Sequence, residues 1–294
     1  MDRPKDVPLG SLLAVLAAAQ WSTMGVLGHA LMDFGIRPLT LVALRAALAF
    51  AVLAILLALF GRQWLSIRRQ DLLFFALYGV IGVTAGYSLF FIAVERTGVA
   101  VSTILLYTYP VIVTVLAVPL LGEAITPSKI VALLLTLCGV VLVAGVLSRH
   151  AARLDGQGVA AALLCAVAVA SQSIFGKKGL RRYTSWTVML YSLGFGAVVL
   201  MASQVILYGM PELNRPPAFW GLLAALACIS TLGAYLTYLF ALTYIEASKA
   251  SVIAAVEPVF AAVLAHTLFR ETLSPVQLLG MALILIGVLA VWRR

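Results

Sequence analysis

Ten long apolar segments follow one another along the chain, separated by short stretches that hold charged residues, glycine or proline. Crossing about 30 Å of hydrocarbon takes about 20 helical residues, and only helices or a closed barrel satisfy the backbone polar groups in lipid. Barrel strands would alternate apolar and polar residues, whereas these segments are continuously apolar. The sequence therefore predicts ten transmembrane helices, at residues 9–31, 38–60, 72–93, 98–120, 128–148, 156–176, 185–208, 218–243, 248–269 and 275–292.

The charges are sparse and unevenly distributed. Only 11% of the residues are charged, against about a quarter in soluble domains. In so apolar a chain, the net charge of +9 indicates the lysine and arginine bias of membrane topology rather than nucleic-acid binding. Loops on the N-terminal side hold 13 lysines and arginines, and the opposite loops hold 6. We therefore expect both termini to be cytoplasmic.

The chain contains an internal duplication. Residues 84–144 align without a gap on residues 232–292, with 15 identities in 61 positions. The constant offset of 148 is close to half of the 294 residues, which predicts two repeats, at 1–148 and 149–294. Each repeat holds five spans, and an odd number turns the second copy upside down. Inverted repeats of this kind serve alternating access in transporters.

Two prolines interrupt spans at matching places in the repeats. Pro110 cannot donate a hydrogen bond to the carbonyl of Leu106, and Pro258 likewise frees the carbonyl of Ala254. Both lie about 15 Å into their spans, near mid-membrane. Matched breaks of this kind indicate a substrate site, and Glu257 stands directly beside one of them.

The fourth and ninth spans carry a family resemblance: YPVIVTVLAVPLLGEAITPSKIVALLLTLCGVVL and EPVFAAVLAHTLFRETLSPVQLLGMALILIGVLA. Each has a proline inside the span, a glutamate at its end and a glycine in the next helix: Pro110, Glu123 and Gly139, then Pro258, Glu271 and Gly287. With QWSTMGVLGHA in the first span and Arg45 in the second, the chain resembles the drug/metabolite transporter superfamily in its ten-helix form with two EamA-type repeats. The resemblance implies an all-α membrane fold, two five-helix bundles around a central cavity, and no catalytic chemistry. Within the superfamily the chain most resembles exporters of aromatic and other amino acids in the bacterial cytoplasmic membrane.

Polar and aromatic side chains within the spans are the predicted substrate-binding residues: Gln20, Trp21, Arg45, Tyr78, Tyr87, Tyr107, Tyr109, Gln172, Tyr235, Tyr238 and Glu257. Arg45 either holds a substrate carboxylate through its planar fork or pairs with a helix-end carbonyl or Glu257. Its role is not duplicated, because the second copy has TVMLYSLGFG there. Glu257 either binds a substrate ammonium, carries a coupling proton or is an internal hydrogen-bond partner. Gln20 and Gln172 hydrogen-bond either a substrate or each other across helices.

Four further residues are predicted to act as hinges or gates: Pro110, Pro258, Glu123 and Glu271. For the two glutamates, which end spans, fixing the adjacent turn is the main interpretation and a gate the alternative. Thr126 and Ser274 stand directly before prolines and are expected to cap the following helices.

These features predict a secondary transporter that exports small metabolites, above all aromatic and other large neutral amino acids. The alternative within transport is an exporter of cationic drugs, with Glu257 and the tyrosines forming a cation–π and carboxylate site. A membrane-embedded enzyme would need a catalytic constellation, and the sequence has no Walker loop, HExxH motif or metal-ligand spacing among its cysteines. A passive channel would not saturate. We expect no cofactor, no metal and no nucleic-acid partner; the partners are a small-molecule substrate and the lipid bilayer, with protons as a candidate coupling ion.

Overall fold

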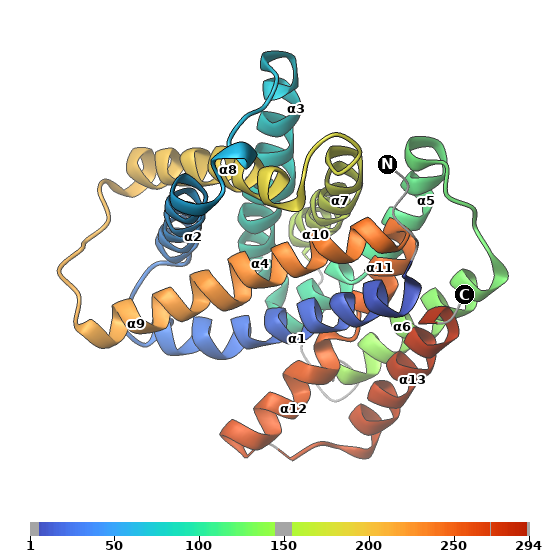
Figure 1. Cartoon of the computed structure of the whole chain (residues 1–294). Helices are drawn as coiled ribbons and strands as arrows, with labels where there is room; N and C mark the ends of the chain where they lie inside the picture. Colours follow the sequence, from blue (N-terminus) through green and yellow to red (C-terminus); the bar gives the residue numbers. More distant parts are fainter. Residues whose placement is uncertain (1–5, 145–154, 271, 293–294) are drawn as a thin grey trace.

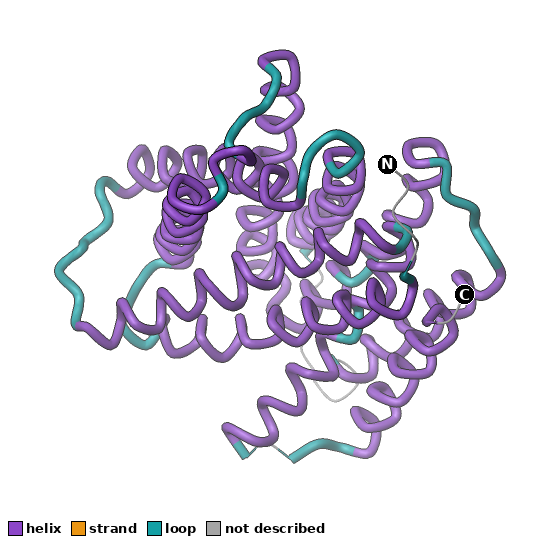
Figure 2. The backbone as a smooth tube through the Cα atoms, viewed as in Figure 1, coloured by secondary structure: helices purple, strands orange, loops and turns teal. Residues whose placement is uncertain are grey.

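A computed structural model describes residues 6–144, 155–270 and 272–292 of the chain. Within these ranges all the regular structure is helical and no strand occurs (Figures 1 and 2). Eight helical runs are long and apolar enough to cross a membrane, and the shorter apolar helices Tyr109–Leu121 and Pro127–Val143 complete the set. The predicted fold of ten spans in two inverted five-helix repeats is confirmed.

The helices of the first repeat are α1 (Val7–Met32), α2 (Pro38–Phe60), α3 (Leu72–Leu77), α4 (Gly86–Leu106), α5 (Tyr109–Leu121) and α6 (Pro127–Val143). Those of the second repeat are α7 (Gly156–Gly179), α8 (Ser185–Tyr208), α9 (Pro217–Ala225), α10 (Ala234–Tyr244), α11 (Ala247–Ala254), α12 (Glu257–Phe269) and α13 (Pro275–Trp292). Gly98, with a φ of 82° inside α4, separates the third span from the fourth. The fifth span was expected to reach residue 148. The part of that expectation beyond residue 144, and the predicted repeat boundary at 148/149, lie outside the described residues.

The duplication extends to irregularities of the backbone. The third span contains a π-helical segment at Tyr78–Ala85, and the eighth contains one at Leu226–Gly233, 148 residues later. Gly122 ends α5 in the left-handed conformation with a φ of 77°, and Arg270 ends α12 in the same way with a φ of 56°. Glycine adopts this conformation at little cost and arginine does not, so the second copy keeps the turn although it has lost the glycine.

The broken spans lie where the prolines predict them. In the fourth span α4 ends at Leu106 and α5 begins at Tyr109. In the ninth span α11 ends at Ala254 and α12 begins at Glu257, again with an offset of 148. Each proline stands in the first turn of the new helix, where its missing N–H leaves no intrahelical bond unmade.

Side chains cap the N-termini of several transmembrane helices. The predicted caps are confirmed: Thr126 Oγ1 accepts from the N–H of Lys129 at 3.4 Å, and Ser274 Oγ accepts from that of Gln277 at 3.2 Å. Asp155 caps α7 and also accepts a hydrogen bond from the Arg96 guanidinium at 2.9 Å. That bond lowers the pKa of the Asp155 carboxyl.

The fifth and tenth spans, α6 and α13, pack through glycines. A Cβ atom at Gly139 would lie 2.5 Å from the carbonyl oxygen of Gly280, and one at Gly287 would lie 3.0 Å from that of Ala132. These two contacts are related by the repeat, since Gly139 matches Gly287 and Ala132 matches Gly280. Helices in lipid associate through such close backbone approach rather than through a hydrophobic driving force.

Ten crossings are even in number, so the start of α1 and the end of α13 lie on one side of the membrane. We call this the terminal face, and the other the opposite face. The fourth span ends and the ninth begins at the terminal face, so α5 and α11 form their terminal-face halves. Residues 99–106 and α12 form the opposite-face halves (Figure 1).

Candidate functional site

Four predicted aromatic residues gather between the repeats. Trp21 of α1 meets the ring of Tyr235 edge-on at 5.1 Å between centroids, and the ring of Tyr238 at 5.3 Å. Tyr87 of α4 donates from its hydroxyl to that of Tyr235 at 3.3 Å. Tyr87 and Tyr235 are repeat counterparts, so this bond joins equivalent positions of the two halves. The repeats therefore meet through an aromatic cluster inside the bundle.

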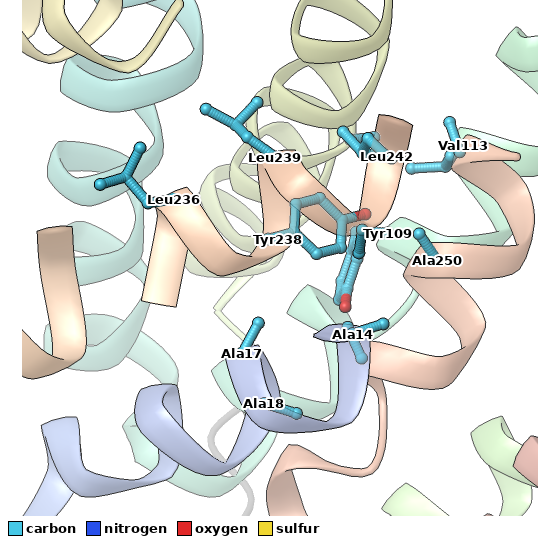
Figure 3. Close-up of a cluster of buried hydrophobic side chains, with 14 of the residues drawn as sticks. Ala14, Ala17, Ala18, Tyr109, Val113, Leu236, Tyr238, Leu239, Leu242 and Ala250 are labelled. Carbon is cyan, nitrogen blue, oxygen red and sulfur yellow. The ribbon is translucent and has the colours of Figure 1, made fainter. Parts of the chain in front are cut away.

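A second group lies at the breaks of the fourth and ninth spans. Tyr107 and Tyr109 flank the break in the first repeat, with 6.1 Å between ring centroids. The Tyr109 hydroxyl donates to the carbonyl of Ser251 at 3.3 Å, and its ring lies beside that of Tyr238 (Figure 3). Glu257 faces the Tyr107 hydroxyl from the opposite break. The two breaks and the aromatic cluster therefore form one continuous region.

A small cavity of about 10 Å³ adjoins the aromatic cluster, room for about one water molecule. The polar residues that line it are Tyr78, Tyr87, Gln172, Ser192, Thr231 and Tyr235. Tyr78 and Thr231 come from the two π-helical segments, and such segments are frequent at functional sites.

Arg45 is buried in α2, with 4% of its surface exposed. Its guanidinium carbon lies 4.1 Å from the centroid of the Tyr87 ring. Among the described residues it makes no ion pair and no hydrogen bond, and its Nε atom is fully enclosed. Neither of the structural partners proposed for Arg45, a helix-end carbonyl or Glu257, is in place.

The two amides are not equivalent, and the alternative in which they bond to each other is not found. Gln172 donates to the carbonyl of Gly82 at 2.6 Å. The matching bond in the other half joins Thr23 to Ser230 at 2.7 Å, so Thr23 rather than Gln20 is the counterpart of Gln172. The Oε1 atom of Gln20 is buried without a partner in the described part of the chain.

Glu123 does not fix its own turn, which was the main interpretation of its position. Its carboxylate reaches the other repeat and accepts from the backbone N–H groups of Ala247 at 2.6 Å and Ser248 at 3.0 Å. It also accepts from the Ser248 hydroxyl. These donors form the start of α11, where an anion interacts favourably with the helix dipole. Glu123 thus joins α5 to α11 at the terminal face.

Cations reinforce the same junction by binding nearby helix ends. Lys129 pairs with Glu246 at 2.7 Å and donates to the carbonyl of Ala124 at 2.7 Å. Lys177 donates to the carbonyls of Leu242 and Ile245 at the end of α10. We propose that the contact of α5 and α11, with Glu123 and these lysines, acts as a gate, and we call it the terminal gate.

The two faces differ in how tightly the broken spans are packed. Every residue of α11 is buried, whereas among its repeat counterparts, residues 99–106, only Ser102 is. In the other pair, α5 buries five residues and α12 buries only Val259. α12 packs chiefly on α1 at the edge of the bundle (Figure 1). The broken spans are therefore tightly packed at the terminal face and loosely packed at the opposite face.

Glu271, the expected counterpart of Glu123, lies outside the described residues. Sequence reasoning missed Ser248 and Lys249, which belong to the terminal gate. The internal alignment holds a signal for both, because their counterparts Ala100 and Val101 are apolar. A polar residue in only one copy of a span half marks a role that the other copy does not share.

Comparison with known proteins agrees with this architecture. A solved crystal structure superposes with a TM-score of 0.82 at 21% identity, covering 96% of this chain and 95% of the other. A relative from Bacillus subtilis, described as the uncharacterized transporter YwfM, is 29% identical over 96% of this chain and 93% of its own length. An uncharacterized transporter from Archaeoglobus fulgidus is 28% identical over 69% of this chain and 70% of its own. The EamA-like transporter family model matches twice, at residues 8–145 and 156–293. The chain belongs to the EamA-like transporter family.

Proposed function

We propose that this membrane transporter exports small metabolites, above all aromatic and other large neutral amino acids, by alternating access. Transport as such follows from the family and from its relatives. The observation that carries the finer proposal is the pair of matched breaks in spans four and nine, which open onto the aromatic cluster. Interrupted spans free backbone groups for a solute at mid-membrane.

The lining of this region suits a bulky amino-acid side chain. Trp21, Tyr107, Tyr109, Tyr235 and Tyr238 supply large apolar surfaces with hydroxyl and indole groups at their edges. Sites for small molecules combine such surfaces with a few polar groups that fix orientation. A strongly charged solute would need more fixed charge than the cluster offers.

The difference between the two faces supports alternating access. We take the terminal face as cytoplasmic, from the charge bias of the loops. The state described here is then closed toward the cytoplasm and loosened toward the outside. In the opposite state α5 and α11 would loosen, and residues 99–106 and α12 would pack tightly. The open side would then be reversed, because the repeats are inverted.

Counterflow in proteoliposomes tests the proposed function. Vesicles loaded with unlabelled phenylalanine should take up labelled phenylalanine in a saturable way and faster than empty vesicles. An imposed pH gradient should change net uptake if protons are coupled. Flux that rises linearly with concentration would indicate a pore, and the absence of exchange for every large neutral amino acid would contradict the proposal.

A second candidate, export of cationic compounds, is favoured by the contact of Glu257 with Tyr107. A carboxylate beside tyrosine rings is suited to an organic cation. Under this alternative, Glu257→Gln should abolish the resistance to a cationic dye that the wild-type protein confers on cells, while phenylalanine counterflow changes by about threefold at most. Glu95→Gln, at an exposed carboxylate, is the control. Loss of amino-acid exchange with intact dye resistance would reject the cationic alternative.

A further inference from the structure

Arg45 is a buried cation whose hydrogen-bonding capacity is unused. A guanidinium carries five N–H donors, and none of those of Arg45 reaches an acceptor within the described residues. Its contact with the Tyr87 ring at 4.1 Å compensates only part of the cost of burying a charge in a span. Aligning the starts of α2 and α8 pairs Arg45 with Ser192, so the repeat architecture itself does not require a charge there.

Two other buried polar atoms in the described part of the chain also lack partners. They are the indole Nε1 of Trp21, a donor, and Oε1 of Gln20, an acceptor. Both adjoin the segment around Tyr235: the Trp21 ring meets the Tyr235 ring at 5.1 Å, and the Gln20 amide lies against Gly233. Arg45 reaches the same place through Tyr87, whose ring it contacts and whose hydroxyl donates to that of Tyr235 at 3.3 Å. Three unsatisfied groups from two spans, α1 and α2, thus lie around Tyr87 and Tyr235, and buried groups of this kind are rare in native proteins.

We propose that Arg45, Trp21 and Gln20 form the subsite for the α-carboxylate and α-ammonium groups of the transported amino acid. A carboxylate only accepts hydrogen bonds, which suits the guanidinium and the indole N–H. An ammonium only donates, which suits the amide oxygen of Gln20. The ligand side chain then lies against the tyrosines of the aromatic cluster. This inference rests on the transport function proposed above and names the groups that select its substrates.

Binding of matched ligands to the purified protein in nanodiscs tests the subsite. The ligands are L-phenylalanine, L-phenylalaninamide, which lacks the carboxylate, and 3-phenylpropionate, which lacks the ammonium. Wild-type protein should bind phenylalanine about tenfold or more tightly than either analogue. Arg45→Met should weaken phenylalanine and phenylpropionate about tenfold or more and leave the amide nearly unchanged. Trp21→Phe keeps an aromatic ring and removes the N–H, and it should weaken binding of the two carboxylates about fivefold.

Arg37→Met is the matched control. Arg37 also lies over a tyrosine ring, that of Tyr208 at 4.6 Å, but it is exposed at the start of the same helix. Arg37→Met should leave the affinities for phenylalanine, phenylalaninamide and 3-phenylpropionate unchanged. Should Arg45→Met fail to fold, the wild-type ligand series and Trp21→Phe still decide the question.

The outcomes separate this subsite from the transport function. If phenylalanine exchanges in counterflow but binds no more tightly than the amide, the subsite is wrong and transport stands. Equal losses for all three ligands in Arg45→Met would assign Arg45 to packing and overturn the inference. If the protein neither exchanges nor binds any amino acid, the proposed function fails and the subsite fails with it.

Discussion

Replacing Glu123 by glutamine should open the terminal gate. The carboxylate accepts from two backbone N–H groups and one hydroxyl at the start of α11. Glutamine has one acceptor oxygen, and its NH₂ group would face a buried N–H donor. Losing the charge-assisted bonds should destabilise the closed gate by about 3 kcal/mol, or about a hundredfold in the ratio of closed to open protein.

A cysteine reporter at Ala250 measures this change. Ala250 is fully buried in α11, so maleimide applied from the terminal face reaches Ala250→Cys only when the gate opens. With Cys138, Cys165 and Cys228 replaced by alanine, labelling should be about tenfold or more faster in Glu123→Gln. Phenylalanine exchange should fall because the gate no longer closes fully. Glu95→Gln removes an exposed carboxylate and should change neither; a labelling rate equal to that of the control would refute the gate role of Glu123.

Much of the fold was predictable because lipid restricts what a chain can form. Continuous apolar segments that cross lipid are helices. The matched Pro110 and Pro258 predicted the positions of both helix breaks to within a few residues. The π-helical segments at Tyr78–Ala85 and Leu226–Gly233 were not predicted. A π-turn uses the same residue types as an α-turn, and its extra residue is accommodated by packing against neighbouring helices rather than by a local sequence signal.

The candidate site was predictable in its aromatic members and less so in its polar ones. The depth of Tyr107, Tyr109, Tyr235 and Tyr238 in their spans placed them correctly inside the bundle. The reach of Glu123 across the repeat boundary could not be foreseen, because it depends on which pair of span halves is closed. The halves are similar in sequence, so small free-energy differences set that choice.

Replacing Lys249 by methionine should have the opposite effect on the terminal gate to replacing Glu123 by glutamine. Its side chain is 4% exposed in α11, and its ammonium has no partner among the described residues. Glu246, three residues earlier in the chain, is already paired with Lys129 at 2.7 Å. Burying an unpaired cation costs free energy that is recovered when the gate opens and water reaches it. Lys249→Met should therefore stabilise the closed gate by about 1–4 kcal/mol.

The measurement is again labelling of Ala250→Cys from the terminal face, together with the thermal unfolding of the purified protein. Labelling should be about tenfold slower in Lys249→Met, the Tm should rise, and exchange should slow because each cycle must reopen the gate. Lys178→Met removes a half-exposed lysine from the same face and should alter none of the three. Faster labelling with a lower Tm would mean that Lys249 holds the gate shut.

The two substitutions can also be combined, because Ser248, which binds Glu123, is adjacent to Lys249 in α11. If both act on one equilibrium between closed and open gate, their opposing effects should largely cancel in the double variant, within the coupling of about 0.5–3 kcal/mol expected for neighbouring residues. Labelling as slow as in Lys249→Met alone would show that the Glu123 bonds contribute little once the buried charge is gone. The closed gate would then depend on packing of α5 against α11. The buried charge of Lys249 would be what limits the stability of the closed gate and so allows it to open.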